Sequence, residues 1–174
     1  MITPWKKLKE KKAGTKYRKV VIKTFKMPDD RIVNFDIKLE GPAVCILALT
    51  KDKKVILTKQ YRPGPEKILL EMPGGFIDEG EKPIKAAKRE MLEETGYTGN
   101  FKFAGTCLEC AYSTMLRYNF VATDCVKTQE QNLEPNEFIE ITQMDLKDFR
   151  KLLQSGELSD VDTGYMCLDF LNLL

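Results

Sequence analysis

The segment from Gly80 to Gly96 constrains the fold more than any other part of this chain, because it has the boundaries of a single helix. Pro83 suits the first turn of a helix, and Gly96 suits a C-terminal stop. At about 100° per residue, an inward-facing stripe forms on one side of that helix. Its members are Ile84, Ala87, Met91 and Thr95.

Three carboxylates lie on an adjoining arc of the same helix: Glu90, Glu93 and Glu94. Like charges three or four residues apart cost a few tenths of a kcal/mol each, and these lie near the negative end of the helix. Arg89 can pair with one of them but cannot neutralise three. Mg²⁺ or Mn²⁺ could do so, because hard cations prefer oxygen ligands. The alternative is a solvated acidic face balanced by Lys85 and Lys88.

Composition removes several classes of chemistry. The chain has no histidine, which excludes Ser-His-Asp and Cys-His catalysis and histidine-bound zinc. Its five cysteines lack a framework spacing, and its N-terminus lacks the apolar stretch of a signal peptide. We therefore expect a reduced, cytoplasmic protein. No apolar run approaches the roughly 20 residues of a membrane span.

Charge is unevenly distributed along the chain. Ten Lys or Arg residues and one acidic residue, Glu10, fall among the first 26 positions. We favour a solvated basic face or loose terminus over a nucleic-acid site there.

Alternating apolar and polar residues predict a β-hairpin from 17–25 and 31–38, around the turn formers 28–30. Residues 44–50 and 55–60 form a second predicted pair of strands, and 44–50 is apolar enough to be buried on both faces. Further strands are predicted near 101–108, 118–123 and 138–142, with helices over 146–155 and 161–174. We expect one α/β fold with a mixed sheet.

The wider segment carries a specific motif. It reads Gly75, five residues, Glu81, seven residues, and then Arg89-Glu90-Met91-Leu92-Glu93-Glu94-Thr95-Gly96-Tyr97. This resembles the full signature of the Nudix hydrolase family, with every fixed position filled. The resemblance implies a Nudix-type α/β/α sandwich with a mixed sheet, here preceded by the N-terminal β-hairpin.

The resemblance also assigns roles to the signature residues. It implies that Glu90 and Glu94 are the main metal ligands, with Glu93 close by and the Gly74 carbonyl as a further ligand. Arg89 is implied to orient the glutamates. The bound metal, Mg²⁺ or Mn²⁺, offsets charge on the diphosphate and lowers the pKa of an attacking water. Glu93, Glu94, Arg89 and a later glutamate form the predicted catalytic set.

That later glutamate is expected in a loop after the signature helix. The matching loop here is Asn132-Leu133-Glu134-Pro135-Asn136-Glu137-Phe138. Glu137 is the predicted general base or water-positioning residue, and Glu134 is close enough to compete.

Outside the signature, the chain is similar to the family branch that cleaves ADP-ribose and other nucleoside-diphosphate sugars. The likeness rests on Gln60-Tyr61-Arg62, Glu71-Met72-Pro73-Gly74-Gly75 and the stretch 154–160. It implies that Arg62 contacts the diphosphate or the terminal ribose of a bound substrate and that Glu71 faces the substrate cleft. The alternatives are a surface ion pair for Arg62 and a loop-bracing carboxylate for Glu71. Tyr112 could stack on a base, or could be a packed aromatic residue of a strand. The chain differs from many ADP-ribose hydrolases at 109–116, which lacks their Ser-Pro-Gly element.

The expected reaction is Mg²⁺-dependent hydrolysis of a nucleoside-diphosphate sugar to a nucleoside monophosphate and a sugar phosphate. The alternatives are a dinucleotide or nucleoside triphosphate substrate, and a non-catalytic nucleotide- or RNA-binding module. By resemblance we expect a homodimer with no membrane or nucleic-acid partner. Residues 1–40 would be a basic arm and hairpin, packed on or swapped between subunits, and 41–174 the Nudix domain.

Overall fold

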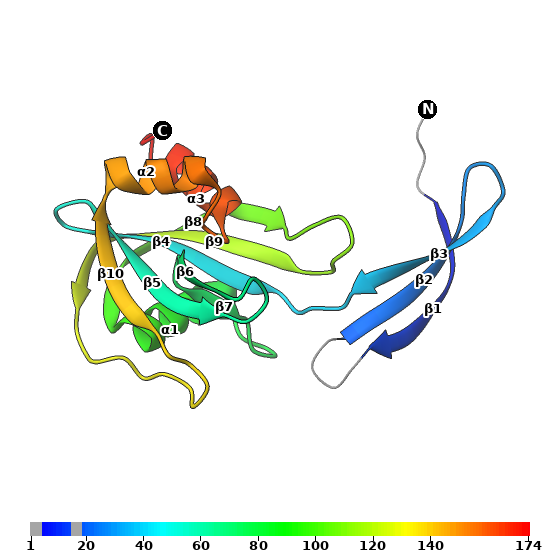
Figure 1. Cartoon of the computed structure of the whole chain (residues 1–174), viewed down its shortest axis with the longest axis horizontal. Coiled ribbons are helices and arrows are strands. Elements are labelled where there is room, and N and C mark those ends of the chain that lie inside the picture. Colours follow the sequence, from blue (N-terminus) through cyan, green and yellow to red (C-terminus); the bar gives the residue numbers. More distant parts are fainter. Residues whose placement is uncertain (1–4, 15–18) are drawn as a thin grey trace. The chain divides into compact units, whose positions relative to one another are not determined.

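The computed structural model describes residues 5–14 and 19–174, which form two compact units. The smaller unit comprises the described residues up to Pro42 together with Leu108–Leu116. The larger unit comprises Ala43–Cys107 and Arg117–Leu174. Each unit contains its own β-sheet (Figure 1). Within the described ranges, no helix has the length and apolar character needed to cross a membrane.

The smaller unit is an antiparallel sheet in the order β1-β2-β3. Strands β2 (Lys19–Lys26) and β3 (Ile32–Lys38) form the predicted hairpin, which is confirmed. The predicted first strand began at Tyr17, which lies outside the described residues.

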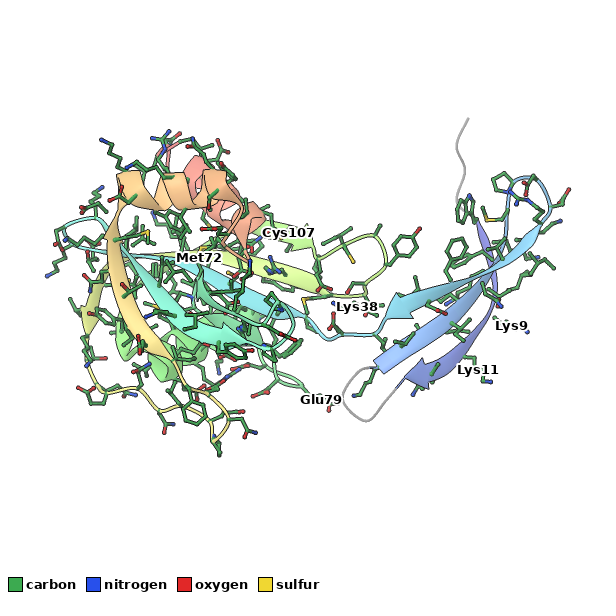
Figure 2. All side chains as sticks on the ribbon, viewed as in Figure 1. Lys9, Lys11, Lys38, Met72, Glu79 and Cys107 are labelled. Atoms are coloured by element: carbon green, nitrogen blue, oxygen red, sulfur yellow. The ribbon has the colours of Figure 1, made fainter. Side chains whose placement is uncertain are left out.

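Strand β1 (Lys6–Gly14) was not predicted. All of its residues are exposed, so it has no buried face and no alternation of apolar and polar residues to reveal it. Lys9 and Lys11 project from it into solvent (Figure 2). Strand β1 is held extended by its pairing with β2, and its lysines discourage further pairing at this edge of the sheet.

The larger unit is built on a mixed sheet in the order β10-β5-β4-β9-β8, with β6 paired to β5 and β7 to β4. Strands β4 and β9 are parallel, whereas β5 pairs antiparallel with β4, β6 and β10. The strands are β4 (Ala43–Thr50), β5 (Lys54–Arg62), β6 (Lys67–Glu71), β7 (Gly74–Phe76), β8 (Tyr97–Leu108), β9 (Leu116–Lys127) and β10 (Glu140–Asp145).

Strand β4 is buried on both faces, as predicted. Its alternate residues enter two separate apolar cores. Cys45, Leu47 and Leu49 pack with side chains of α2 (Leu146–Ser155) and α3 (Val161–Phe170). The other alternate set packs against α1 (Pro83–Thr95).

The helices therefore cover opposite faces of the sheet, α1 on one and α2 with α3 on the other (Figure 1). This is the predicted α/β/α sandwich with a mixed sheet, and that prediction is confirmed.

Some predicted boundaries were wrong. Strand β10 begins at Glu140 rather than Phe138, because the Phe138 side chain is 84% exposed and precedes the pairing with β5. Helix α3 ends at Phe170, four residues before the predicted end. The short strands β6 and β7 were not predicted, since each has too few residues for a periodic pattern.

Candidate active site

Helix α1 has the predicted limits, with Pro83 in its first turn and Gly96 at its C-terminal cap. Ala86, Ala87 and Met91 are buried against the sheet, which fixes the rotation of the helix. That rotation places the three glutamates along one cleft. Glu94 is buried, whereas Glu90 and Glu93 are partly exposed.

Arg89 connects three of the signature carboxylates. Its Nε and Nη2 donate to the two oxygens of Glu81 at 3.1 and 2.9 Å. Its Nη1 donates to Glu90 Oε1 at 2.8 Å and to Glu93 Oε2 at 3.2 Å. The hydrogen bond from Arg89 holds the pKa of Glu81 below its ordinary value. Arg89 therefore orients Glu90 and Glu93 while Glu81 fixes the guanidinium.

Strand β7 brings main chain close to the same carboxylates. A Cβ on Gly75 would lie 2.5 Å from the carboxylate carbon of Glu90, so glycine at this position lets that group stay where it is. The Gly74 N–H donates to Glu94 Oε2 at 2.9 Å. The sequence Gly74-Gly75 thus lets a strand edge contact both of the predicted main ligands.

Burial changes the protonation of two carboxylates. Loss of solvent raises the pKa of Glu94 from 4.5 to about 8, against the lowering effect of the Gly74 N–H. Desolvation also raises the pKa of Glu90, despite the hydrogen bond from Arg89. Glu90 and Glu137 add to the shift at Glu94 by like-charge repulsion. A cation in this region would relieve both effects.

The donor set suits a hard divalent cation. Glu90, Glu93 and Glu94 supply oxygen ligands beside the main chain of Gly74, and Arg89 alone offsets only part of their charge. Within residues 5–14 and 19–174, no three acidic or cysteine side chains converge closely enough to chelate an ion as they stand.

The glutamates line a cleft of about 830 Å³ within the larger unit. Such a volume accommodates a nucleotide-sized ligand. The cleft is lined by Gln60, Tyr61, Arg62, Pro63, Gly74, Gly75, Phe76, Arg89, Glu90, Glu93, Glu94, Asn132, Leu133, Glu134, Asn136, Glu137 and Phe138.

The loop 132–138 thus contributes both candidate bases, Glu134 and Glu137, to the cleft that the signature helix lines. The two form a local turn, in which the Glu137 N–H donates to the Glu134 carbonyl and the Glu134 N–H donates to Glu137 Oε2 at 2.9 Å. Glu137 is partly buried and Glu134 is exposed.

The ends of this loop are joined through residues that sequence reasoning missed. Gln131 Nε2 donates to the carbonyls of both Glu94 and Ile139, at 2.6 and 3.1 Å. The Asn132 N–H donates to the Glu93 carbonyl at 2.9 Å. These bonds also satisfy carbonyls at the end of α1 that would lack partners within the helix. No local motif marks them, because they depend on the tertiary approach of two distant segments.

Arg62 and Glu71, both predicted to bind substrate, lie close together but differ in their access to the cleft. Arg62 is among the lining residues. Glu71 is 5% exposed, and its carboxylate pairs with the Arg62 guanidinium at 2.6 Å. Glu71 is not among the residues that line the cleft.

Tyr112, the predicted base-stacking residue, belongs to the smaller unit. The residue is 56% exposed, and its ring stacks on Phe35 with ring centroids 6.4 Å apart. The Tyr112 carbonyl accepts a hydrogen bond from the Lys38 N–H at 2.8 Å, which attaches this segment to β3.

Comparison with known proteins agrees with this arrangement. A family model described as NUDIX domain matches residues 39–161. An ADP-ribose pyrophosphatase of Bacillus subtilis (strain 168) is 31% identical over 147 residues, covering 83% of this chain and 80% of that protein. A methanol dehydrogenase activator of Bacillus methanolicus is 25% identical over 151 residues, with 83% and 80% coverage.

A solved structure described as an ADP compounds hydrolase superposes with a TM-score of 0.80, covering 100% of this chain and 99% of that one. The sequence identity is 20%, so this likeness concerns the fold. The family match spans the whole cleft-lining set, including the signature helix and the loop 132–138. The chain therefore belongs to the Nudix hydrolase family, whose members cleave phosphoanhydride bonds.

Proposed function

We propose that this protein hydrolyses the diphosphate linkage of a nucleoside-diphosphate sugar resembling ADP-ribose, with Mg²⁺ as the activating ion. The products are a nucleoside monophosphate and a sugar phosphate. The observation that carries the proposal is the single cleft that contains the α1 glutamates, Arg62 and the acidic loop 132–138. The similar ADP-ribose pyrophosphatase supports the choice of substrate class.

The proposed roles follow from position. Glu90, Glu93, Glu94 and the Gly74 carbonyl hold the metal, and Arg89 keeps the glutamates oriented. When bound, the metal neutralises diphosphate charge and acidifies an attacking water. Mn²⁺ offers the same oxygen-ligand chemistry.

The remaining groups act on the substrate. Glu137 accepts the proton of the water, with Glu134 as the competing base. Arg62 binds the diphosphate, since a guanidinium matches the geometry of phosphate oxygens. Glu71 supports substrate binding beside it. Tyr112 is the proposed base-stacking residue, because it is an exposed aromatic residue.

We further propose a homodimer in which residues 1–40, the basic arm and hairpin, pack on or exchange between subunits, with 41–174 as the Nudix domain. Exposed apolar side chains in the smaller unit support an interface there, namely Trp5, Leu8 and Ile32. A reducing, cytoplasmic setting fits the five free thiols. Light scattering after gel filtration measures the oligomeric state.

The test of the reaction is product analysis. The purified protein is incubated with Mg²⁺ and ADP-ribose, other nucleoside-diphosphate sugars, dinucleotides or nucleoside triphosphates. Nucleotide products are separated by chromatography, with Glu94→Gln as the control. We expect monophosphate release from a diphosphate sugar, dependent on metal and absent in the control.

Two other results would contradict the proposed substrate class or the proposed reaction. Release of inorganic pyrophosphate from triphosphates alone would overturn the substrate class. Absence of turnover with Mg²⁺ or Mn²⁺, together with a salt-sensitive affinity for RNA, would indicate a binding module.

A further inference from the structure

Glu71 occupies a buried position that is fully supplied with hydrogen-bond donors. Gln60 Nε2 and Arg62 Nε each donate to Oε2 at 2.8 Å. Ser159 Oγ donates to Oε1 at 3.0 Å. A carboxylate that is only 5% exposed requires such partners, because an uncompensated buried charge is strongly destabilising. Both oxygens of Glu71 are therefore engaged before any substrate arrives.

The register of β5 and β6 produces this arrangement. Thr58 pairs with Glu71 in the antiparallel ladder. Residues 58, 60 and 62 point to the same face of β5, since side chains alternate along a strand. The carboxylate of Glu71 therefore meets the side chains of Gln60 and Arg62 from one side of the sheet.

A diphosphate in the cleft needs a cationic side chain that can bind its oxygens. Its lining contains five glutamates and two arginines. Arg89 is committed to Glu81, Glu90 and Glu93. Arg62 uses Nε and Nη2 on Glu71, and its Nη1 has no acceptor among the described residues. Arg62 thus retains donor capacity for an anionic oxygen.

Ser159 links this arrangement to the segment before α3. Its Oγ also lies 2.9 Å from Asp160 Oδ2, so the Ser159 side chain lies between the carboxyl groups of Glu71 and Asp160. Asp160 in turn lies 3.5 Å from Arg117 on β9. The Glu71 carboxylate is thereby held between β5 and the C-terminal part of the larger unit.

We infer that Glu71 is a positioning residue for Arg62, and that Ser159 is a second positioning residue acting through Glu71. Together they hold the Arg62 guanidinium with its Nη1 edge available to the diphosphate. Fixing a long side chain in advance lowers the ordering cost of binding. The inference rests on the proposed function, because it assigns Arg62 to the diphosphate of that substrate.

Steady-state kinetics at saturating Mg²⁺ test the inference. Glu71→Gln should raise KM for the diphosphate substrate about tenfold, because it removes the charge that pairs with Arg62, and Ser159→Ala roughly threefold, because it removes one hydrogen bond to the Glu71 carboxylate. In both variants kcat should stay within about twofold, since the reacting groups are untouched. Ser159→Thr keeps the hydroxyl and should therefore have the KM of the unsubstituted protein.

Two comparisons separate positioning from other roles. Ser155→Ala is the matched control, because Ser155 is exposed and its hydroxyl bonds only to nearby main chain. In an Arg62→Ala background, Glu71→Gln and Ser159→Ala should cause no further rise in KM. An additive rise would overturn the inference in favour of direct contact between Glu71 and substrate. A fall in kcat accompanied by a fall in melting temperature would overturn it in favour of a structural role.

A readout that needs no turnover distinguishes failure of the inference from failure of the proposed function. The Arg62 Nε–H signal in ¹H–¹⁵N NMR spectra, assigned by its loss in Arg62→Lys, should be protected from water exchange. It should lose protection in Glu71→Gln and partly in Ser159→Ala. An unprotected signal in the unsubstituted protein would overturn the inference. A protected signal without turnover of diphosphate sugars would overturn the proposed function and, with it, the assignment of Arg62 to that substrate.

Discussion

Glu94 and Glu137 line the same cleft, yet the chain holds them in different ways. Glu94 projects from a packed helix, is buried, and accepts a main-chain hydrogen bond from Gly74. Glu137 lies in a loop, and its carboxylate bonds to a main-chain N–H only three residues away. Burial raises the pKa of Glu94, which makes its ionised form costly to the fold.

The difference indicates that the helix side and the loop side of the cleft have different roles. The helix side is preorganised, and its carboxylates are held where solvation alone cannot stabilise their charge. The loop side is adaptable, because Glu137 can leave its local turn without disturbing an apolar core. Activity should depend on both sides, whereas stability should depend mainly on the helix side.

Glu94→Gln should have the largest effect. We expect activity to fall about a thousandfold, because a metal ligand is lost. The metal-free protein should nevertheless become more stable at pH 8, since the neutral amide keeps an oxygen for the Gly74 N–H and removes a buried charge. Kinetics and urea unfolding in the presence of EDTA measure the two effects. Loss of both activity and stability would contradict the proposed difference between the helix side and the loop side.

Glu137→Gln should lower kcat about a hundredfold, as expected for loss of a general base. Its melting temperature should be unchanged, because glutamine can still accept the Glu134 N–H. Glu134→Gln is the matched control from the same loop and should change kcat by less than about threefold. A larger effect at Glu134 would transfer the role of base to that residue.

Stability of the metal-free protein should fall as pH rises from 4.5 to 8. Over this range folded Glu94, with its pKa of about 8, retains a proton that the unfolded chain has released. The loss of stability accumulates over this range, to about 5 kcal/mol, and levels off above pH 8, where both states have released the proton. Denaturant unfolding at several pH values measures this trend. Glu94→Gln should flatten it, whereas Glu137→Gln should leave most of it, because desolvation is the largest cause of the shift and repulsion by Glu137 a smaller one.

Gly75→Ala should give the smallest effect, about a tenfold loss of activity. Its Cβ would meet the end of the Glu90 side chain, which can move away and leave the fold intact. Gly74→Ala is the informative comparison, because its Cβ would lie 2.3 Å from the Val44 carbonyl oxygen and should destabilise the protein. Gly64→Ala, with nothing within 4 Å, is the neutral control. Equal melting temperatures for all three would contradict this account.

The parts predictable from sequence were those with local signals. Helix α1 has its proline, its glycine and its apolar stripe within one segment, and β4 is a continuous apolar run. The grouping of Glu90, Glu93 and Glu94 also follows from helix periodicity. These features need no knowledge of distant contacts.

The remaining features depend on tertiary structure. Strand β1 is exposed along its length and is defined by pairing with β2. The Glu71 carboxylate is defined by the register of β5 with β6 and by Ser159, 88 positions later. The attachment of the Tyr112 segment to Lys38 likewise joins distant parts of the chain. Residue type alone could not distinguish a buried Glu71 from one exposed to the cleft.

The paired hydrogen bonds of Gln131 have an evolutionary consequence. By contacting the carbonyls of both Glu94 and Ile139, this side chain closes the base of the loop 132–138 against the end of α1. The part of the loop between these points can therefore change in sequence or length, apart from Asn132 and the candidate bases, without altering the sheet or the metal-binding helix. We therefore expect related chains to vary this loop outside the position of the candidate base, Glu137, while they retain the metal-binding helix.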